Sequence, residues 1–354
     1  MARLRKTLPK NFEELLNQGD IDELKAVLEK CELYAYSGYS KKTALFFPNI
    51  PDELVRYLVQ EKGMKINHPD IYGTTPLHKQ AEYGSKNLEL FIELGANMDA
   101  VTKTDKETPL HVASYRHHVD AVKTLIAHGA KINAKNWQRN NPLEAMLRSC
   151  PNMDIEKVAD IAEIFLNQGM KINNKMKEQV QRIGKNFEFY KADFNPDYLE
   201  VTEQGLNKLY QLFSVSPVPP LKRHNGISKI TVINGTWPKQ HNALWELLVP
   251  GRGQANTVQG EVIRISGRVA REVMDNGGMN WDNEYRKMLK YLLDCFAEGN
   301  LLTEKELKEA QYIGKLISHS GEADDEPERL MELAVKWVAQ NTEPIQLGEV
   351  EYKR

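Results

Sequence analysis

The tetrapeptide Thr75-Pro76-Leu77-His78 decides the fold, because it returns along the chain at a nearly fixed interval. Thr108-Pro109-Leu110-His111 repeats it 33 residues later, and Asn141-Pro142-Leu143-Glu144 follows after another 33. A related start, Thr43-Ala44-Leu45-Phe46, lies 32 residues before the one at Thr75. Four starts with this spacing predict a stack of repeated units that bury their apolar faces against one another.

Each start is followed by an apolar helical stripe and then by a glycine, at Gly63, Gly95, Gly129 and Gly169. A threonine caps the first helix of a unit, and the proline fits its first turn, where an amide N–H has no intrahelical partner. The glycine ends the second helix in a left-handed conformation. The pattern therefore predicts two short helices per unit.

Residues 11–174 resemble an ankyrin-repeat array on these motifs. The resemblance implies helix–loop–helix repeats with a projecting hairpin, a concave face that binds protein, and His78 and His111 bonded to neighbouring backbone. Residues 11–35 are similar to an atypical first repeat, with Phe12 to Leu16 as one helix and Gly19-Asp20 as the turn. The repeat that starts at Asn141 is seven residues longer than the one before it, around 148–155, where Pro151 predicts a loop.

The 33-residue period ends beyond the repeats, and we expect three parts: residues 1–190 as the solenoid with a closing helix, 191–220 as a connecting helix and Pro-rich linker, and 221–354 as a helical domain. Residues 227–233 are the one convincing strand candidate. The fold class is all-α, an ankyrin-repeat solenoid followed by a mainly helical C-terminal domain. Residues 220–300 also resemble a segment of bacterial and phage-associated proteins, which implies a bacterial origin but no activity.

Composition excludes several classes of protein. The 47 basic and 49 acidic residues leave a net charge of −2, so the chain is no generic polycation for nucleic acid. No apolar run reaches the roughly 18 residues of a membrane span, and no secretory signal precedes Pro9. Three dispersed cysteines form no disulfide framework and are expected to be small buried hydrophobic side chains. We expect a cytoplasmic protein.

The sequence contains no motif that indicates a catalytic residue, a cofactor or a metal site. Glycines at 251–253 and 277–278 form no phosphate loop and are expected to be turns. His117, His118 and His128 lack a carboxylate or cysteine at ligand spacing. We expect His117 to take the turn position that glycine usually occupies in a repeat.

The sharpest polar cluster lies on a helix predicted over 254–275, with Asn256 as its cap and Gln259 reaching back to it. Glu261, Arg264 and Arg268 follow at spacings of three and four residues and share one face, which continues to Glu272. Two interpretations stay open: a solvated face of self-paired charges, or an anion site in which Glu261 orients the arginines. Asp282 is expected to cap the next helix, with Trp281 packing beside it.

Hairpin tips and outward positions of the first helices carry specificity in such a solenoid, and Tyr, Trp and Arg dominate binding hot spots. Trp137 either faces a partner or packs on the next hairpin. The candidate partner-binding residues are Tyr72, Lys79, Tyr83, Asp105, Tyr115, Arg116, Trp137 and Arg139.

The function that this pattern favours is an adaptor or inhibitor that binds a partner protein, with neutralisation of a toxin or effector as one concrete form. Two alternatives remain. One is an enzyme with a C-terminal site around Glu261 and Arg264, to which the repeats recruit a substrate. The other is a secreted bacterial effector that engages a host protein. A membrane role is not expected, and nucleic-acid binding is disfavoured, because basic and aromatic residues do not interleave along a stripe.

Overall fold

The structure is a computed structural model that describes residues 3–321 and 323–354. The chain divides into two compact units, the first made of residues 1–185 and 195–218 and the second of residues 186–194 and 219–354. The first unit therefore includes the segment around 196–213, which was expected to connect the two halves.

The first unit begins with a small sheet that sequence patterns did not indicate. Strand β1 (Arg5–Thr7) pairs in parallel with β2 (Cys31–Ser37), and β2 pairs antiparallel with β3 (Lys42–Thr43). Helices α1 (Phe12–Gln18) and α2 (Ile21–Leu28) stand between β1 and β2. Gly19 ends α1 at φ 73°, and Asp20 caps α2 by accepting a hydrogen bond from the Glu23 amide. The expected helix pair of the first repeat is thus confirmed.

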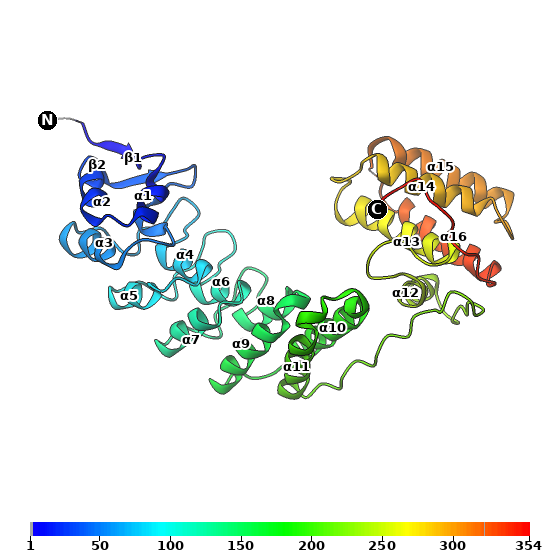
Figure 1. Ribbon diagram of the computed structural model, residues 1–354, viewed down its shortest axis with the longest axis horizontal. Helices are drawn as coiled ribbons and strands as arrows, with labels where there is room; N and C mark the ends of the chain where they lie inside the picture. The colour runs from blue at the N-terminus through cyan, green and yellow to red at the C-terminus, as the bar shows by residue number, and fades with distance from the viewer. Residues whose placement is uncertain (1–2, 322) are drawn as a thin grey trace. The chain divides into compact units, whose positions relative to one another are not determined.

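The following repeats form two rows of helices (Figure 1). The inner row consists of the short 3₁₀ turn η1 (Ala44–Phe46), α4 (Pro76–Tyr83), α6 (Pro109–Tyr115) and α8 (Pro142–Arg148). The outer row consists of α3 (Asp52–Arg56) with the π turn η2 (Tyr57–Glu61), α5 (Leu88–Glu93), α7 (Val119–Ala127) and α9 (Ile155–Asn167). The leucine of each repeat start is fully buried between neighbouring units, at Leu45, Leu77, Leu110 and Leu143.

The extra residues of the longest repeat form the predicted loop, with a 3₁₀ turn η3 (Asn152–Asp154) before α9. Helix α10 (Asn174–Tyr190) and the turn η4 (Lys191–Asp193) follow, and α11 (Pro196–Phe213) then packs on α9. Gly205 permits this contact, because a Cβ there would lie 2.7 Å from Glu156 Cα. Helix α11 therefore closes the solenoid.

The second unit is a bundle around α13 (Val258–Ala270), which contacts α12 (Trp237–Leu248), α14 (Asn283–Phe296) and α16 (Glu326–Gln340). The π turn η5 (Arg271–Asp275) continues α13, and α15 (Glu304–Ser320) packs on α14 and α16. Branched aliphatic residues and Trp337 fill its core.

The strand predicted over 227–233 is wrong. This segment has no β pairing, although Ile230 is buried and its amide donates to the Thr342 carbonyl at 2.8 Å. A strand requires a neighbouring edge along its length, and here a single backbone hydrogen bond replaces that edge. The glycines at 251–253 and 277–278 lie in bends and turns, as expected.

Candidate protein-binding face of the repeats

The histidines of the repeat starts hold adjacent units in register. His111 Nδ1 accepts a hydrogen bond from the Thr108 amide at 3.2 Å, which leaves Nε2 to donate to the Asn140 carbonyl at 3.1 Å. His78 makes the equivalent contacts with Thr75 and with the Glu107 carbonyl. Both side chains are buried, and this burial lowers their pKa, that of His111 to about 4. The expected bonds to neighbouring backbone are confirmed.

Between each outer helix and the next inner helix the chain projects as a finger. We define four fingers: residues 38–42, 69–74, 102–107 and 135–140. Asn136 Oδ1 accepts hydrogen bonds from the Gln138 and Asn140 amides, and this Asx turn shapes the fourth finger. Asp70 does the same for the second finger, through the Tyr72 and Thr74 amides.

Backbone hydrogen bonds join the fingers into one continuous edge. The Ile71 amide donates to the Ser40 carbonyl at 3.2 Å, and the Lys103 amide donates to the Tyr72 carbonyl at 2.8 Å. The Trp137 amide donates to the Asp105 carbonyl at 2.9 Å. The four tips therefore lie side by side at fixed spacing, and they present their side chains as a row.

The side chains at these tips are exposed. Tyr72 is 46% exposed and Trp137 is 59% exposed, and both Asp105 and Arg139 are also open to solvent. Trp137 thus uses its amide, and not its indole ring, to attach its finger to the neighbouring one. Arg139 has a φ of 61°, so its position in the turn is conformationally demanding as well as exposed.

A second group of candidates lies at the C-terminal ends of the inner helices. Tyr83 and Tyr115 are about half exposed. Glu82 links the ends of the two helices, because it pairs with Arg116 at 2.7 Å and with Lys79 on its own helix. Burial raises the pKa of Glu82, but these two cations outweigh it and the net effect is a lowered pKa. The ion pairs hold Lys79 and Arg116 in place beside the two tyrosines.

We call the combined surface the finger face and define it by the exposed side chains of the four fingers and of the inner-helix ends. Sequence reasoning missed its first finger, where Tyr39 is 86% exposed and Lys41 and Lys42 are neighbours. The signal was present: the repeat starts at Thr43 and Thr75 differ by 32 residues, which places position 40 opposite Tyr72.

The histidines outside the repeat starts have structural contacts. His117 occupies the left-handed turn at φ 57°, as expected, and its Nδ1 lies 3.3 Å from Asp154 in the inserted loop. His118 Nε2 bonds to the Glu82 carbonyl, and His128 lies beside Glu89. Among the residues that the structure describes, no group of His, Cys, Asp and Glu side chains is arranged to hold a metal ion.

In the second unit Glu261 and Arg264 are buried, so the expected solvation of this face is wrong for these two residues, whereas their expected pairing is confirmed. Glu261 and Arg264 are 0% and 1% exposed and form a bidentate pair, in which Arg264 Nε lies 2.8 Å from Glu261 Oε2. Tyr352 Oη donates to Glu261 at 2.6 Å, and Arg264 Nη2 donates to the Arg354 carbonyl at 2.8 Å. The chain's own residues 352–354 thus occupy this site.

The other members of the stripe differ in environment. Arg268 is half-buried and has no ion-pair partner among the described residues. Glu272 is buried and accepts hydrogen bonds from the Asn276 and Asn280 side chains. Arg264 Nη1 is likewise without a hydrogen-bond partner in the described structure. An anion site at Arg264 and Arg268 remains a prediction that these contacts do not test.

The cap predicted for this helix is also wrong. Thr257 caps α13 by accepting a hydrogen bond from the Gly260 amide, whereas Gln259 is buried and donates to the carbonyls of Asn341 and Glu343. Asp282 caps α14 as expected. Trp281 stacks on Tyr285 with ring centroids 5.3 Å apart, which confirms its packing role.

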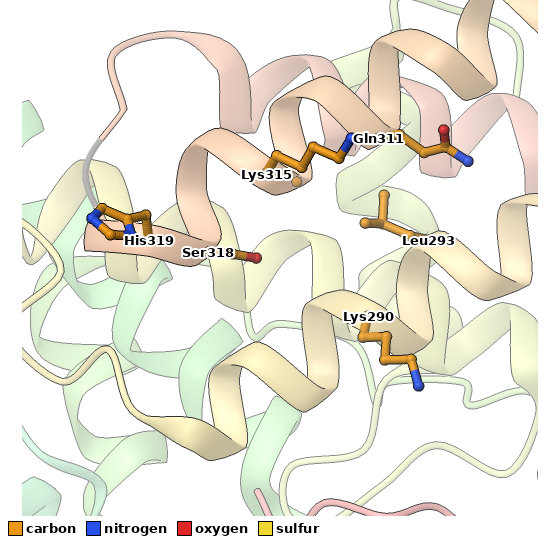
Figure 2. A pocket seen from close by; sticks show the side chains of 7 residues that line it. Lys290, Leu293, Gln311, Lys315, Ser318 and His319 are labelled. Carbon is orange, nitrogen blue, oxygen red and sulfur yellow. The ribbon is translucent and has the colours of Figure 1, made fainter.

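A groove of about 480 Å³ lies between α14 and α15 (Figure 2). Leu293 and Gly314 contribute to its lining. Lys290 on α14 and Lys315 on α15 also line it. The two helices pack closely here because Gly314 has no side chain, and a Cβ at this position would collide with the Leu293 side chain.

Cys31, Cys150 and Cys295 are free and buried, as expected for small hydrophobic side chains. Within residues 3–321 and 323–354, no helix combines the length and the apolar character that crossing a bilayer requires.

Comparison with known proteins agrees with this geometry. The profile of the family described as ankyrin repeats (3 copies) matches residues 47–136 and 82–176. The chain is 38% identical over 96 residues to a palmitoyltransferase of Drosophila melanogaster, and 36% identical over 88 residues to an ankyrin repeat protein of Variola virus. It is 27% identical over 99 residues to an inhibitor of Bruton tyrosine kinase of Xenopus laevis. This chain therefore carries ankyrin repeats.

These matches are confined to a part of each protein. They cover 27%, 24% and 27% of this chain in the same order, but only 15%, 15% and 7% of the relatives' own lengths. The relatives differ in what their names describe, so the likeness lies in the repeats and not in a common activity. They come from eukaryotes and a virus, and the expected bacterial origin stays a prediction.

Proposed function

We propose that the chain binds a partner protein through the finger face. The observation that carries this proposal is the row of exposed aromatic side chains on a rigid repeat scaffold, with Tyr115 51% and Trp137 59% exposed. Large aromatic side chains exposed on a folded surface have no role in the core, and they are the residues that most often dominate binding energy. Ankyrin repeats and the repeat-containing relatives support an interaction role in general.

The adaptor or inhibitor acts by occupying its partner's surface. Neutralisation of a toxin or effector is one form of this role, and engagement of a host protein by an exported chain is another. Both forms use the same finger face. The enzyme alternative has weaker support, because Glu261 and Arg264 bind each other and the chain's own C-terminal residues.

An affinity purification from host lysate, followed by mass spectrometry, tests the proposal. The full chain is compared with a Tyr115→Ala/Trp137→Ala variant. We expect the native chain to retain one main partner and the variant to lose it, because the two changes remove exposed aromatic area without opening the core.

The matched control is Met153→Ala/Tyr198→Ala. These side chains are also exposed in the first unit, at 73% and 53%, but they lie outside the finger face. Retention of the partner by the control and its loss from the finger-face variant support the proposal. Equal retention of the partner by both variants contradicts it.

A further inference from the structure

The outer helices of the repeats are strongly acidic. Helices α2, α3, α5, α7 and α9 carry ten acidic side chains against four basic ones. The acidic residues are Asp22, Glu23, Asp52, Glu53, Glu89, Glu93, Asp120, Glu156, Asp160 and Glu163, and the basic ones are Lys25, Arg56, Lys123 and Lys157. A net charge of −2 for the whole chain hides this imbalance.

The finger face has the opposite charge. The fingers and inner helices carry seven exposed basic residues and two half-buried ones. The exposed residues are Lys41, Lys103, Lys106, Arg116, Lys135, Arg139 and Arg148, and the half-buried ones are Lys42 and Lys79. Asp105 is the exposed carboxylate among them. Glu82 and Glu107 are half-buried, Asp70 and Glu144 are buried, and burial raises the pKa of Glu107.

Part of this positive charge is not neutralised by the chain itself. Lys106 and Arg139 stand at two neighbouring tips, and neither has an ion-pair partner within the described residues. Two like charges held near each other on adjacent fingers raise the local positive potential. The fixed backbone bond between Asp105 and Trp137 prevents the tips from moving apart to relieve it.

The exposed aromatic residues lie on the same surface as these cations. Tyr39, Tyr72 and Trp137 are on fingers, and Tyr83 and Tyr115 end inner helices, whereas the outer helices carry no large exposed hydrophobic side chain in the described residues. Guanidinium and ammonium groups bind carboxylates, and the neighbouring aromatic rings bind apolar side chains.

We propose that the finger face binds an acidic segment of the partner protein, in which Asp or Glu residues are interspersed with apolar ones. This inference rests on the proposed binding function and names the chemistry of the partner. Carboxylates of the segment contact Lys106 and Arg139 at the tips, and its apolar side chains pack on Trp137 and Tyr115. The acidic outer helices repel the same segment, so the charge distribution also selects the face that binds.

Protein is favoured over nucleic acid as the occupant. A nucleic-acid surface needs a continuous positive track along the phosphates. Here Glu82 pairs with Arg116 and Lys79, and Asp105 is exposed on the third finger next to Lys106. These carboxylates interrupt the track but can accept hydrogen bonds from the backbone amides of a bound protein segment.

The test uses the full chain and a Lys106→Glu/Arg139→Glu variant. The control, Lys123→Glu/Lys157→Glu, makes the same change in net charge on outer helices, where both side chains are more than half exposed. The probes are a fluorescent Glu-rich peptide that contains Phe, its Gln counterpart, and a single-stranded oligonucleotide with as many negative charges. Anisotropy measures binding at about 50 mM and about 300 mM salt.

We expect the Glu peptide to bind the native chain and the control, with an affinity about tenfold or more weaker for the finger variant. Higher salt is expected to weaken this binding. A Gln peptide that binds equally well, an oligonucleotide that binds in preference, or a control as weak as the finger variant overturns the inference.

The same variants separate the two proposals when they are used in the affinity purification. A partner that is lost with Tyr115→Ala/Trp137→Ala but retained by Lys106→Glu/Arg139→Glu preserves the binding function and refutes the acidic segment. A partner retained by both variants refutes the binding function itself. A partner lost from both, and crosslinked to the tips through an Asp- or Glu-rich stretch, supports both proposals.

Discussion

His111 shows how one side chain can connect two repeats. His111 lies in the first turn of α6. Its Nδ1 accepts a hydrogen bond from the amide of Thr108, the residue that caps this helix, and its Nε2 donates to the Asn140 carbonyl in the next finger. Only the neutral imidazole can do both, because a protonated ring has no acceptor. The contact that orders the repeats is therefore tied to the protonation of a buried group.

Acidification should destabilise the repeats through this residue. The folded-state pKa of His111 is lowered to about 4, below its ordinary value, so the unfolded chain binds the proton more readily. The contribution of His111 to the free energy of unfolding is therefore complete above about pH 6.5. It decreases as the pH drops toward 4, by up to about 3 kcal/mol. Urea denaturation of the first unit at several pH values measures this loss.

A His111→Gln variant serves as the comparison for this prediction. It should unfold more easily at pH 7, by about 1–3 kcal/mol, since the bridge to Asn140 is lost. Its stability should also depend less on pH between 6.5 and 4. The same slope in the variant and in the native chain would falsify the assignment to His111.

At the scale of elements, α11 shows why the last helix belongs to the first unit. Gly205 lies where α11 meets the N-terminus of α9, and backbone atoms of Glu156 and Ile155 occupy the space that a side chain would need. Buried residues of the same helix, among them Leu209 and Phe213, complete the contact. The packing of α11 on α9 is possible because Gly205 has no side chain, and an apolar side chain at this position would not fit.

Replacing this glycine tests the interpretation. Alanine favours an isolated helix over glycine by about 1 kcal/mol. In this chain Gly205→Ala should nevertheless destabilise the first unit by about 1–3 kcal/mol, because the new Cβ forces α11 away from α9. The control Asn207→Ala lies on the exposed side of the same helix and should be neutral or stabilising in chemical denaturation. A stabilising Gly205→Ala would show that the two helices do not pack so closely.

At the scale of the whole molecule, the second unit is closed by its last residues. At the start of α13 the Val258 amide donates a hydrogen bond to the Ile345 carbonyl. The Leu347 amide donates to the Asn256 carbonyl. The Glu261 carboxylate accepts hydrogen bonds from the Tyr352 hydroxyl, the Ala255 amide and the Arg264 guanidinium. Burying a charged pair is costly unless its remaining hydrogen bonds are satisfied, so the final segment belongs to the core of this unit.

Removal of residues 349–354 should therefore destabilise the second unit by about 2–4 kcal/mol. Tyr352→Phe deletes only the hydroxyl bond to Glu261 and should cost about 1 kcal/mol. Hydrogen exchange resolves the effect by unit: protection is expected to fall in α13 and α14 and to persist in α6 and α8. Unchanged protection in α13 after the truncation would mean that the segment does not stabilise the buried pair.

Sequence alone was sufficient for the repeats because their information is local. Caps, first-turn prolines and terminal glycines specify helix ends within a few residues, and the interval of 32 or 33 places Leu77 and Leu110 at equivalent buried positions. The exposed tips Tyr72 and Trp137 followed from the same register. The first finger was overlooked because its start, at Thr43, lacks the Pro and His of the other repeats.

Features that depend on contacts between residues far apart in the chain were decided only by the tertiary structure. A stripe of Glu261, Arg264 and Arg268 looks the same in sequence whether water or protein surrounds it. In the structure Glu261 and Arg264 are buried, and Glu261 accepts a hydrogen bond from Tyr352, which is 91 residues away in the chain. The strand expected over 227–233 failed for the same reason, since no edge came to pair with it. Helix ends are set by neighbouring residues, whereas burial, pairing and the charge of an assembled face are set by contacts that a linear pattern does not contain.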